Sequence, residues 1–372
     1  MKTPLKNRNI LLLMAFICAM TESMAQRYAA PLSPEESLKK LHVAAGFSVE
    51  LFASEPHVFD PVALEFDAQG NAYVIEMPDY PYEVEPGKGY GRIRLLKDTD
   101  GDGKPELLLA GEWMALHVFT FDKGAWSNST AQFGLENTRG FWKRILVADV
   151  NGDGKTDLLA GNFGTNSRLR TSAAKPLRLA INDFDQNGSI EQILHHHENG
   201  KSIPWILKNT LVKQIPSLKK QVLSYADYKD KALEELFPQS VWAKSLILQA
   251  DWMETTLWIN QGNGKMEIET LPAEVQYAPV HAMTVLPRPG KSALILLGGN
   301  ESRIKPELGT QLGSYGWVLE KDANNRWKAL KPQESGIFVP GEIRDFQWIQ
   351  SNKQTHLYVL RNHDKPLVFT LR

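Results

Sequence analysis

A short acidic loop that recurs three times constrains the fold of this chain more than any other feature. The copies run over residues 98–106, 149–157 and 183–191. Each has oxygen-bearing side chains at its first, third, fifth and ninth positions and a glycine at its sixth, and a short apolar segment follows. This alternation of hard oxygen ligands around a tight turn is typical of calcium-binding loops. The predicted Ca2+ ligands are Asp98, Asp100, Asp102, Glu106, Asp149, Asn151, Asp153, Asp157, Asp183, Asp185, Asn187 and Glu191.

The loops differ from EF-hands, which need a glutamate at position twelve and a helix on each side. Position twelve is Leu109, Ala160 or Leu194, and strand-like apolar residues flank the acids. An acidic loop between two strands, repeated along the chain, resembles the FG-GAP/VCBS repeat of integrin-type β-propellers. The alternative is an Asp/Gly turn that holds no ion, because these residues favour turns on their own. That alternative weighs most at residues 183–191, where Gln186 and Asn187 depart from the pattern.

Residues 1–25 have the pattern of a secretory signal peptide. Basic residues come first, an apolar run of about eleven residues follows, and a small-x-small cleavage site ends the segment. A lipoprotein anchor at Cys18 is the alternative, but Ile17 is not the small residue that such an anchor needs before the cysteine. We therefore expect an exported protein, periplasmic or extracellular, with no transmembrane segment in the mature chain. Cys18 is the only cysteine, so the mature chain would have no disulfide.

Residues 33–104 carry a second resemblance. Ser33 followed by Pro-Glu-Glu is a helix start, and alternating apolar phrases at residues 46–52, 60–66, 72–82 and 91–96 predict strands. Together these phrases resemble the first blade of the planctomycete-type, sugar-dehydrogenase-like membrane-bound dehydrogenases. The later blades of that family are missing from the chain. It also has no Cys-x-x-Cys-His for attaching a c-type haem.

From residue 105 onward the resemblance changes. Phrases at residues 110–114, 133–137, 161–166 and 214–219 are similar to the carboxyl-terminal part of the VCBS-repeat proteins grouped with the UnbV/ASPIC and cartilage acidic protein families. The predicted organisation is a signal peptide at 1–25, a dehydrogenase-like blade region at 26–104 and an FG-GAP/VCBS region at 105–372. The resemblance changes at the acidic loop of residues 98–106, which both families possess, and a fusion of two propeller genes at this loop would explain the change. The alternative is one divergent family.

Repeat spacing predicts an all-β fold, a β-propeller of roughly five to seven blades. The first and second loops start 51 positions apart, close to one four-stranded blade, and the second and third start 34 apart, a short blade or part of one. Apolar residues at helical spacing, Leu207, Leu211, Ile215 and Leu218, predict a helical insertion near 203–237. The insertion either shapes a ligand pocket or simply packs on the fold.

Two smaller clusters suggest other sites. His195, His196 and His197 invite a transition-metal interpretation, although on a strand only the first and third face the same side. Arg139, Trp142, Lys143 and Arg144 invite an anion site, against the alternative of ordinary solvated charges. Rim tryptophans are candidates for stacking on sugar rings.

Composition and motifs narrow the function. The chain has 42 basic and 43 acidic residues and no polybasic run, so nucleic acid is not an expected partner. It has no nucleophile elbow, P-loop, dinucleotide fingerprint or His-Glu-x-x-His, and we predict no catalytic or cofactor-binding residue. The favoured function is a calcium-stabilised binding or adhesion module for protein or glycan. The alternatives are a periplasmic sugar dehydrogenase of the pyrroloquinoline-quinone type and an inactive fusion relic.

Overall fold

In this computed structural model, the described residues are 32–42, 48–54, 58, 60–66, 72–76, 92–96, 106–122, 125–262, 265–288, 291–351 and 354–371. The chain divides into two compact units, Met1–Gly103 and Lys104–Arg372, and each is described by itself. The predicted signal peptide and residues 98–105 of the first acidic loop lie outside the described residues. Among the described helices, none has the length and apolar character needed to cross a membrane.

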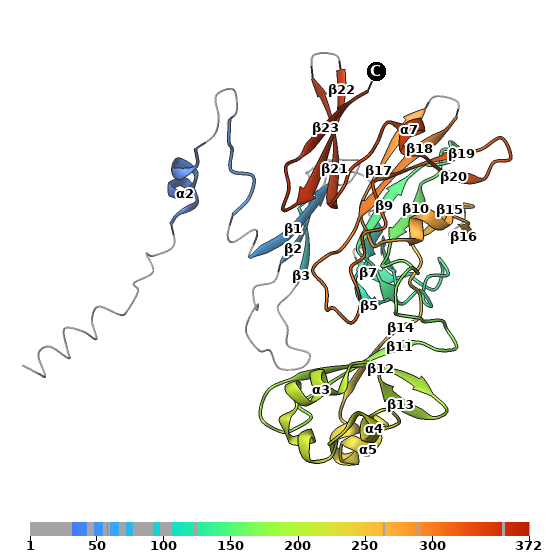
Figure 1. Cartoon of the computed structure of the whole chain (residues 1–372). Coiled ribbons are helices and arrows are strands. Elements are labelled where there is room, and N and C mark those ends of the chain that lie inside the picture. Colours follow the sequence, from blue (N-terminus) through green and yellow to red (C-terminus); the bar gives the residue numbers. More distant parts are fainter. Residues whose placement is uncertain are drawn as a thin grey trace, which may run out of the picture. The chain divides into compact units, whose positions relative to one another are not determined.

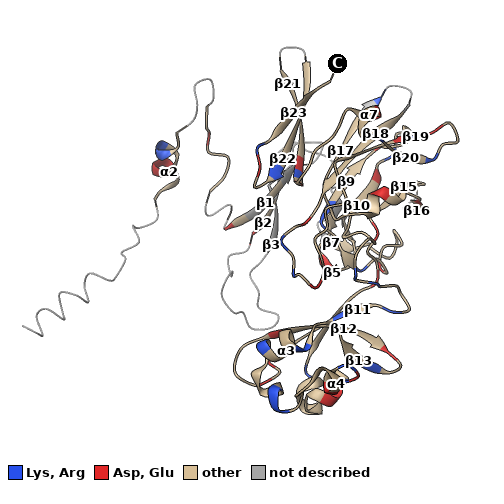
Figure 2. Cartoon of the chain, in the orientation of Figure 1, with Lys and Arg blue, Asp and Glu red and all other residues tan. Residues whose placement is uncertain are grey.

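The first unit contains one short helix and one antiparallel sheet. Helix α2 (Pro34–Lys40) begins at a capping box, in which Ser33 Oγ accepts the N–H of Glu36 and Glu36 Oε2 accepts the N–H of Ser33. Acidic residues fill its first turn and lysines its last, as Figure 2 shows, and this order suits the helix dipole. The predicted helix start is confirmed. The sheet has the order β1-β2-β3, with β1 (Pro61–Phe66), β2 (Ala72–Glu76) and β3 (Arg92–Leu96).

The second unit is predominantly β (Figure 1). Its sheets have the orders β4-β6-β7, β16-β15-β10-β9, β13-β12-β11-β14, β17-β18-β19-β20 and β21-β22-β23, with β5-β8 as a separate pair. The strands are β4 (Glu106–Leu109), β5 (Glu112–Met114), β6 (His117–Asp122), β7 (Ala125–Asn128), β8 (Gly140–Phe141), β9 (Arg144–Ala148), β10 (Asp157–Gly161), β11 (Leu177–Asn182), β12 (Glu191–Glu198), β13 (Lys201–Pro204), β14 (Leu246–Ala250), β15 (Thr256–Asn260), β16 (Met266–Glu269), β17 (Val280–Arg288), β18 (Lys291–Gly299), β19 (Trp317–Lys321), β20 (Trp327–Leu330), β21 (Glu342–Ser351), β22 (Gln354–Asn362) and β23 (Leu367–Thr370). The helices are α3 (Lys208–Gln214), η1 (Pro216–Lys220), α4 (Tyr225–Tyr228), α5 (Leu233–Leu236), α6 (Gln239–Trp242), η2 (Ala273–Gln276) and α7 (Pro332–Ser335).

Successive residues of strand β10 point into two different cores. Leu158 and Ala160 pack in a cluster with residues of β6, while Leu159 between them packs in a cluster with residues of β17, β18 and β19. Because side chains alternate across a strand, a sheet that is apolar at every position must be covered on both faces. The sheet β16-β15-β10-β9 is therefore enclosed between two neighbouring sheets.

The same alternation extends the stack by one more sheet. In β18, Ile295 and Leu297 face the β10 side, whereas Leu296 packs with Phe346 and Leu357 of the last sheet. Strands β9, β17 and β21 contact one another in that order. Four sheets are thus stacked face to face in the manner of propeller blades. No core cluster of the described residues joins the first of these sheets to the last, so the predicted five to seven blades and the closed ring stay predictions.

A large insertion interrupts the second sheet of this stack. Strand β10 pairs with β15, for example Leu158 with Trp258, across about a hundred residues of chain. Residues 162–255 leave the sheet after β10 and return at β15, and we call them the inserted domain. Its helices span residues 208–242, compared with the predicted 203–237, and it also contains the whole sheet β13-β12-β11-β14. The third acidic loop therefore belongs to the inserted domain and not to the next stacked sheet.

The inserted domain has a core of its own, between one face of its sheet and its helices. Ala180 and Ile193 of the sheet pack with Leu211, Ile215 and Leu218, all of them essentially inaccessible to solvent. The last three are among the four residues whose spacing predicts the helical insertion; the fourth, Leu207, is exposed and precedes α3. Figure 1 shows this sheet and its helices together in the green-to-yellow part of the chain. A separate small cluster that includes Phe163, Leu177 and Met253 packs where the domain joins the stack.

Candidate metal centre

The third acidic loop, between β11 and β12, brings its acids together. The carboxylate oxygens of Asp183, Asp185 and Glu191 lie within 4.8 Å of one another. Asp183 also closes the turn, because its two oxygens accept the N–H groups of Asn187 and Gly188, each at 2.9 Å. Asn187 Oδ1 accepts the N–H of Ser189 at 2.8 Å. The loop is therefore fixed by its own side chains while three carboxylates converge.

Among the described residues, no basic side chain forms an ion pair with these three carboxylates. Glu191 is almost fully buried, and burial raises its pKa; the charges of Asp185 and Asp183 raise it too, while the N–H of Phe184, which donates to Glu191 Oε2 at 2.8 Å, lowers it. Asp185 Oδ1 is buried and has no hydrogen-bond partner among the described residues. An all-oxygen donor set with an unpaired buried oxygen fits a hard divalent cation such as Ca2+.

The second loop, between β9 and β10, uses its acids differently. Asp149 accepts the N–H groups of Gly152 at 2.7 Å and Gly154 at 2.9 Å. Asp157 is buried, and its two oxygens accept the N–H groups of Val150 and Asn260. Burial raises the pKa of Asp157, and the two N–H groups oppose that shift. Asp157 therefore links the loop to β15 through these two hydrogen bonds.

The second loop keeps to the sequence pattern more closely than the third, yet its acids are less gathered. Asn151 accepts the N–H of Asp153 at 2.9 Å, and Asp153 accepts that of Lys155 at 2.8 Å, which lowers the pKa of Asp153. Across the part of the chain that the structure describes, the Asp183 group is the one set of three acids or histidines within 4.8 Å. In the first loop, Asp98, Asp100 and Asp102 lie outside the described residues, and of Glu106 only the backbone is described, at the start of β4.

Histidines 195–197 lie on β12, beside the acidic loop. His195 is 1 % exposed, and neither of its ring nitrogens has a hydrogen-bond partner among the described residues. Burial lowers the pKa of His195 to about 4; the charge of Arg178 on β11 acts in the same direction, and that of Glu234 on α5 opposes it. The ring meets Trp242 edge-on, with 5.8 Å between ring centroids. His195 is therefore a neutral, buried side chain, and among the described residues it belongs to no group of three metal-ligating side chains.

The basic residues at 139–144 do not form an anion site. Arg139 pairs with Asp251 at 2.6 Å, Lys143 pairs with Glu112, and Arg144 lies 3.5 Å from Asp345. Their acidic partners are distant in sequence, so only the tertiary structure shows that these charges are already compensated.

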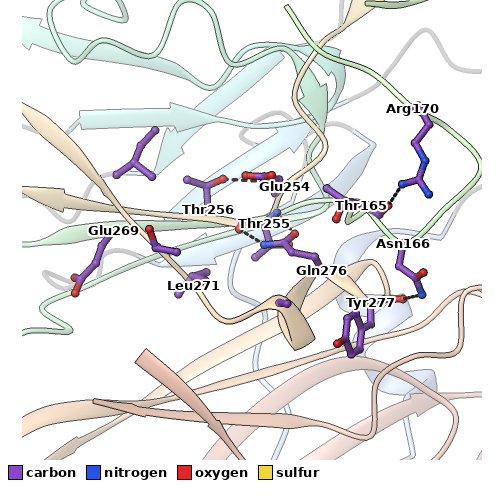
Figure 3. Close-up of a pocket in the computed structure, with 13 residues that line it drawn as sticks. Thr165, Asn166, Arg170, Glu254, Thr255, Thr256, Glu269, Leu271, Gln276 and Tyr277 are labelled. Atoms are coloured by element: carbon purple, nitrogen blue, oxygen red, sulfur yellow. Dashed lines mark hydrogen bonds between the residues drawn. The ribbon is translucent and has the colours of Figure 1, made fainter. Parts of the chain in front are cut away.

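A polar cavity of about 520 Å³ was not foreseen from the sequence (Figure 3). Residues 165–170 and 254–256, at the two ends of the inserted domain, form part of its wall, and residues 268–277 form the rest. Its lining is mainly threonine, amide and charged side chains from three separate segments. No local motif links these segments, and the sequence therefore carried no signal of the site.

Comparison with known protein families matches two segments of the chain, and these segments overlap at the first acidic loop. Residues 33–107 match a domain of unknown function, DUF7133, and residues 98–160 match the FG-GAP-like repeat. A search of curated proteins found no match. The FG-GAP resemblance is thus confirmed over the first two loops, and the two matches overlap on the first of them. Neither of these two families is the UnbV/ASPIC group or the sugar dehydrogenases, so those two resemblances stay predictions.

Proposed function

We propose that this chain is an exported, β-propeller-like binding module that calcium stabilises and that recognises an extracellular or periplasmic protein or glycan. The FG-GAP-like repeat at residues 98–160 and the face-to-face stack of sheets support the binding module. FG-GAP repeats are typical of extracellular proteins, which supports export. The signal-peptide pattern at residues 1–25 agrees with it.

The calcium part of the proposal is carried by the convergence of Asp183, Asp185 and Glu191. Bound there, the ion would supply positive charge to these three converging carboxylates. In the second loop, Asp149, Asn151, Asp153 and Asp157 would hold a second ion, and in the first loop Asp98, Asp100, Asp102 and Glu106 a third, by analogy of pattern. Ions at these loops would fix the turns between paired strands, and binding to the folded state alone would stabilise the fold.

Thermal unfolding of the purified protein in calcium and in chelator tests this proposal. We expect the midpoint to rise with calcium, because the ion binds only where the fold gathers the acids. Asp185→Asn should lose a large part of the rise. The matched control is Asp230→Asn, which alters an exposed aspartate of the same inserted domain. An equal calcium response in wild type, Asp185→Asn and Asp153→Ala would refute a role for the loops.

A further inference from the structure

The polar cavity adjoins a second one at the junction between the inserted domain and the stack. The second cavity measures about 510 Å³, and Thr165, Arg170 and Glu254 line both. Asn137, Ser172 and Trp252 line the second cavity but not the first, whereas Glu269 and Tyr277 line the first but not the second. We call the pair the junction groove. Each compartment has the size of an ordinary small-ligand site, and the two adjoin at the three residues that they share.

The walls of the groove are held by hydrogen bonds that leave little freedom. The Gln276 side chain accepts the N–H of Thr255 at 2.9 Å and donates to the Thr255 carbonyl at 2.8 Å, as Figure 3 shows in part. The Gln276 carbonyl accepts the N–H groups of Thr165 and Asn166. Gly164, with φ of 83°, has no room for a side chain, since a Cβ would lie 2.6 Å from the same carbonyl. The groove is therefore preformed, which lowers the entropy lost on binding.

Free hydrogen-bonding groups face this preformed groove. The Glu254 carboxylate is exposed and makes no hydrogen bond or ion pair among the described residues. Arg170 donates one hydrogen bond, to the Thr165 carbonyl, and keeps its other donors. Tyr277 is 41 % exposed, and Trp252, whose Nε1 is engaged with Thr256 Oγ1, contributes to the wall at the other end.

This combination selects for one chemistry. One cation and a few carboxylates among hydroxyl and amide groups suit neither a polyanion nor an apolar ligand. Hydroxyl groups of a sugar can donate to Glu254 and accept from Arg170, and aromatic faces offer apolar contact to sugar rings. Two compartments in a row fit a chain of sugars better than a single one.

We propose that the junction groove binds a linear oligosaccharide, with Glu254 and Arg170 between two sugar positions and Tyr277 and Trp252 flanking them. The proposal names the ligand class of the binding module and rests on that proposed function. It also gives the inserted domain a role, since Thr165, Arg170 and Glu254 stand at the ends of that domain. Without the insertion, β10 would run directly to β15 and the groove would have only one wall.

A panel of soluble linear oligosaccharides tests the groove. Neutral gluco-, manno-, xylo- and N-acetylglucosamine series, with a uronic acid series, are titrated into the full protein in calcium buffer by isothermal calorimetry. At least one series should bind, and a tetrasaccharide should bind more tightly than its disaccharide. Tyr277→Ala and Glu254→Gln should each weaken binding about tenfold. Tyr225→Ala is the matched control, because Tyr225 is similarly exposed but lies on α4.

Each outcome separates this inference from the proposed function. If no series binds while calcium still raises the midpoint of unfolding, the groove assignment fails and the calcium-stabilised module stands. Binding that Tyr225→Ala reduces as much as Tyr277→Ala would also overturn the assignment. So would capture of a peptide that competes at Tyr277 in place of the sugars. Loss of the calcium response alone would refute calcium stabilisation, one part of the proposed function, and would leave the binding module and its groove standing.

Discussion

Two sheets of this protein begin from the same local motif and end in different environments. The hairpin β9–β10 and the hairpin β11–β12 each carry an acidic nine-residue loop. The first lies in a sheet that is covered by other sheets on both faces, and the second lies in a sheet whose core is completed by helices. The loop motif thus specifies a hairpin, and the neighbours of the hairpin decide what kind of core it joins.

The two sheets also differ in whether the polar groups that they bury have hydrogen-bond partners. Residues 158–160 of β10 are buried and apolar, and the buried Asp157 before them accepts two backbone N–H groups. In β12 the buried Ile193 is followed by the buried His195, with unpaired ring nitrogens. Since burying a polar group without a partner costs free energy, the inserted domain should be the more sensitive of the two to solvent conditions.

The largest expected effect is the loss of apolar volume from the stacked sheets. Leu257→Ala, on β15, should lower the free energy of unfolding by about 4 kcal/mol, because this fully buried residue packs between two sheets. Urea denaturation followed by tryptophan fluorescence measures it. Ile268→Ala, at an exposed position of the edge strand β16 in the same sheet, is the control and should change little. Equal losses from the two variants would mean that Leu257 is not part of the packed core.

The second-largest expected effect is a loss of stability at acid pH that depends on His195 of the inserted domain. The pKa of His195 is about 4 in the folded state against 6.5 ordinarily, so the unfolded chain takes up a proton first as the pH falls. The contribution of neutral His195 to the free energy of unfolding is therefore fully present above pH 6.5. It decreases by about 3 kcal/mol as the pH falls to 4. His195→Gln should flatten this dependence in urea titrations across that range. His196→Gln, on the opposite face of β12, should leave it unchanged, and an unaltered slope in His195→Gln would contradict the assignment.

The stabilisation that calcium gives at the third loop should depend on pH. The raised pKa of Glu191 means that the folded state holds its proton more tightly than the unfolded chain, so without calcium its contribution to stability declines as the pH rises through that pKa. Calcium needs the ionised form, and its gain, about 2.7 kcal/mol at a hundred times Kd, should be smaller at pH 5 than at pH 7.

The shift of the unfolding midpoint with calcium at each pH measures this competition. Glu191→Gln should lower the shift, whereas Glu198→Gln, at the exposed end of the same strand, should not. A calcium gain that stays the same at both pH values would argue against Glu191 as a ligand.

The smallest effect concerns the helices that replace a neighbouring sheet in the inserted domain. Helix α4 starts with a capping box of Ser224 and Asp227. Ser224→Ala should cost about 1 kcal/mol, because the N–H of Asp227 loses its acceptor. Ser240→Ala, in α6, serves as the control, since the Ser240 side chain makes no hydrogen bond among the described residues. Chemical denaturation measures the free energy of unfolding of both variants. Equal values would mean that the Ser224 cap does not stabilise α4.

Local features of this protein could be predicted from its sequence because they depend on neighbours in the chain. The helix start at Ser33, the hairpin around residues 149–157 and the helical spacing of Leu211, Ile215 and Leu218 all follow from side chains a few residues apart. Turn chemistry and hydrophobic periodicity act over this short range.

The pairing of β10 with β15 and the site geometry were decided only by the tertiary structure. Strand pairing across residues 162–255 depends on which apolar faces pack together, whereas the repeat spacing of 34 positions predicts a short blade or part of one. The same holds for the tighter gathering of acids at Asp183 than at Asp149, for the burial of His195 and for the junction groove. Sequence determined the loops and their chemistry; long-range packing determined which of them converge, because contacts between distant segments leave no local pattern.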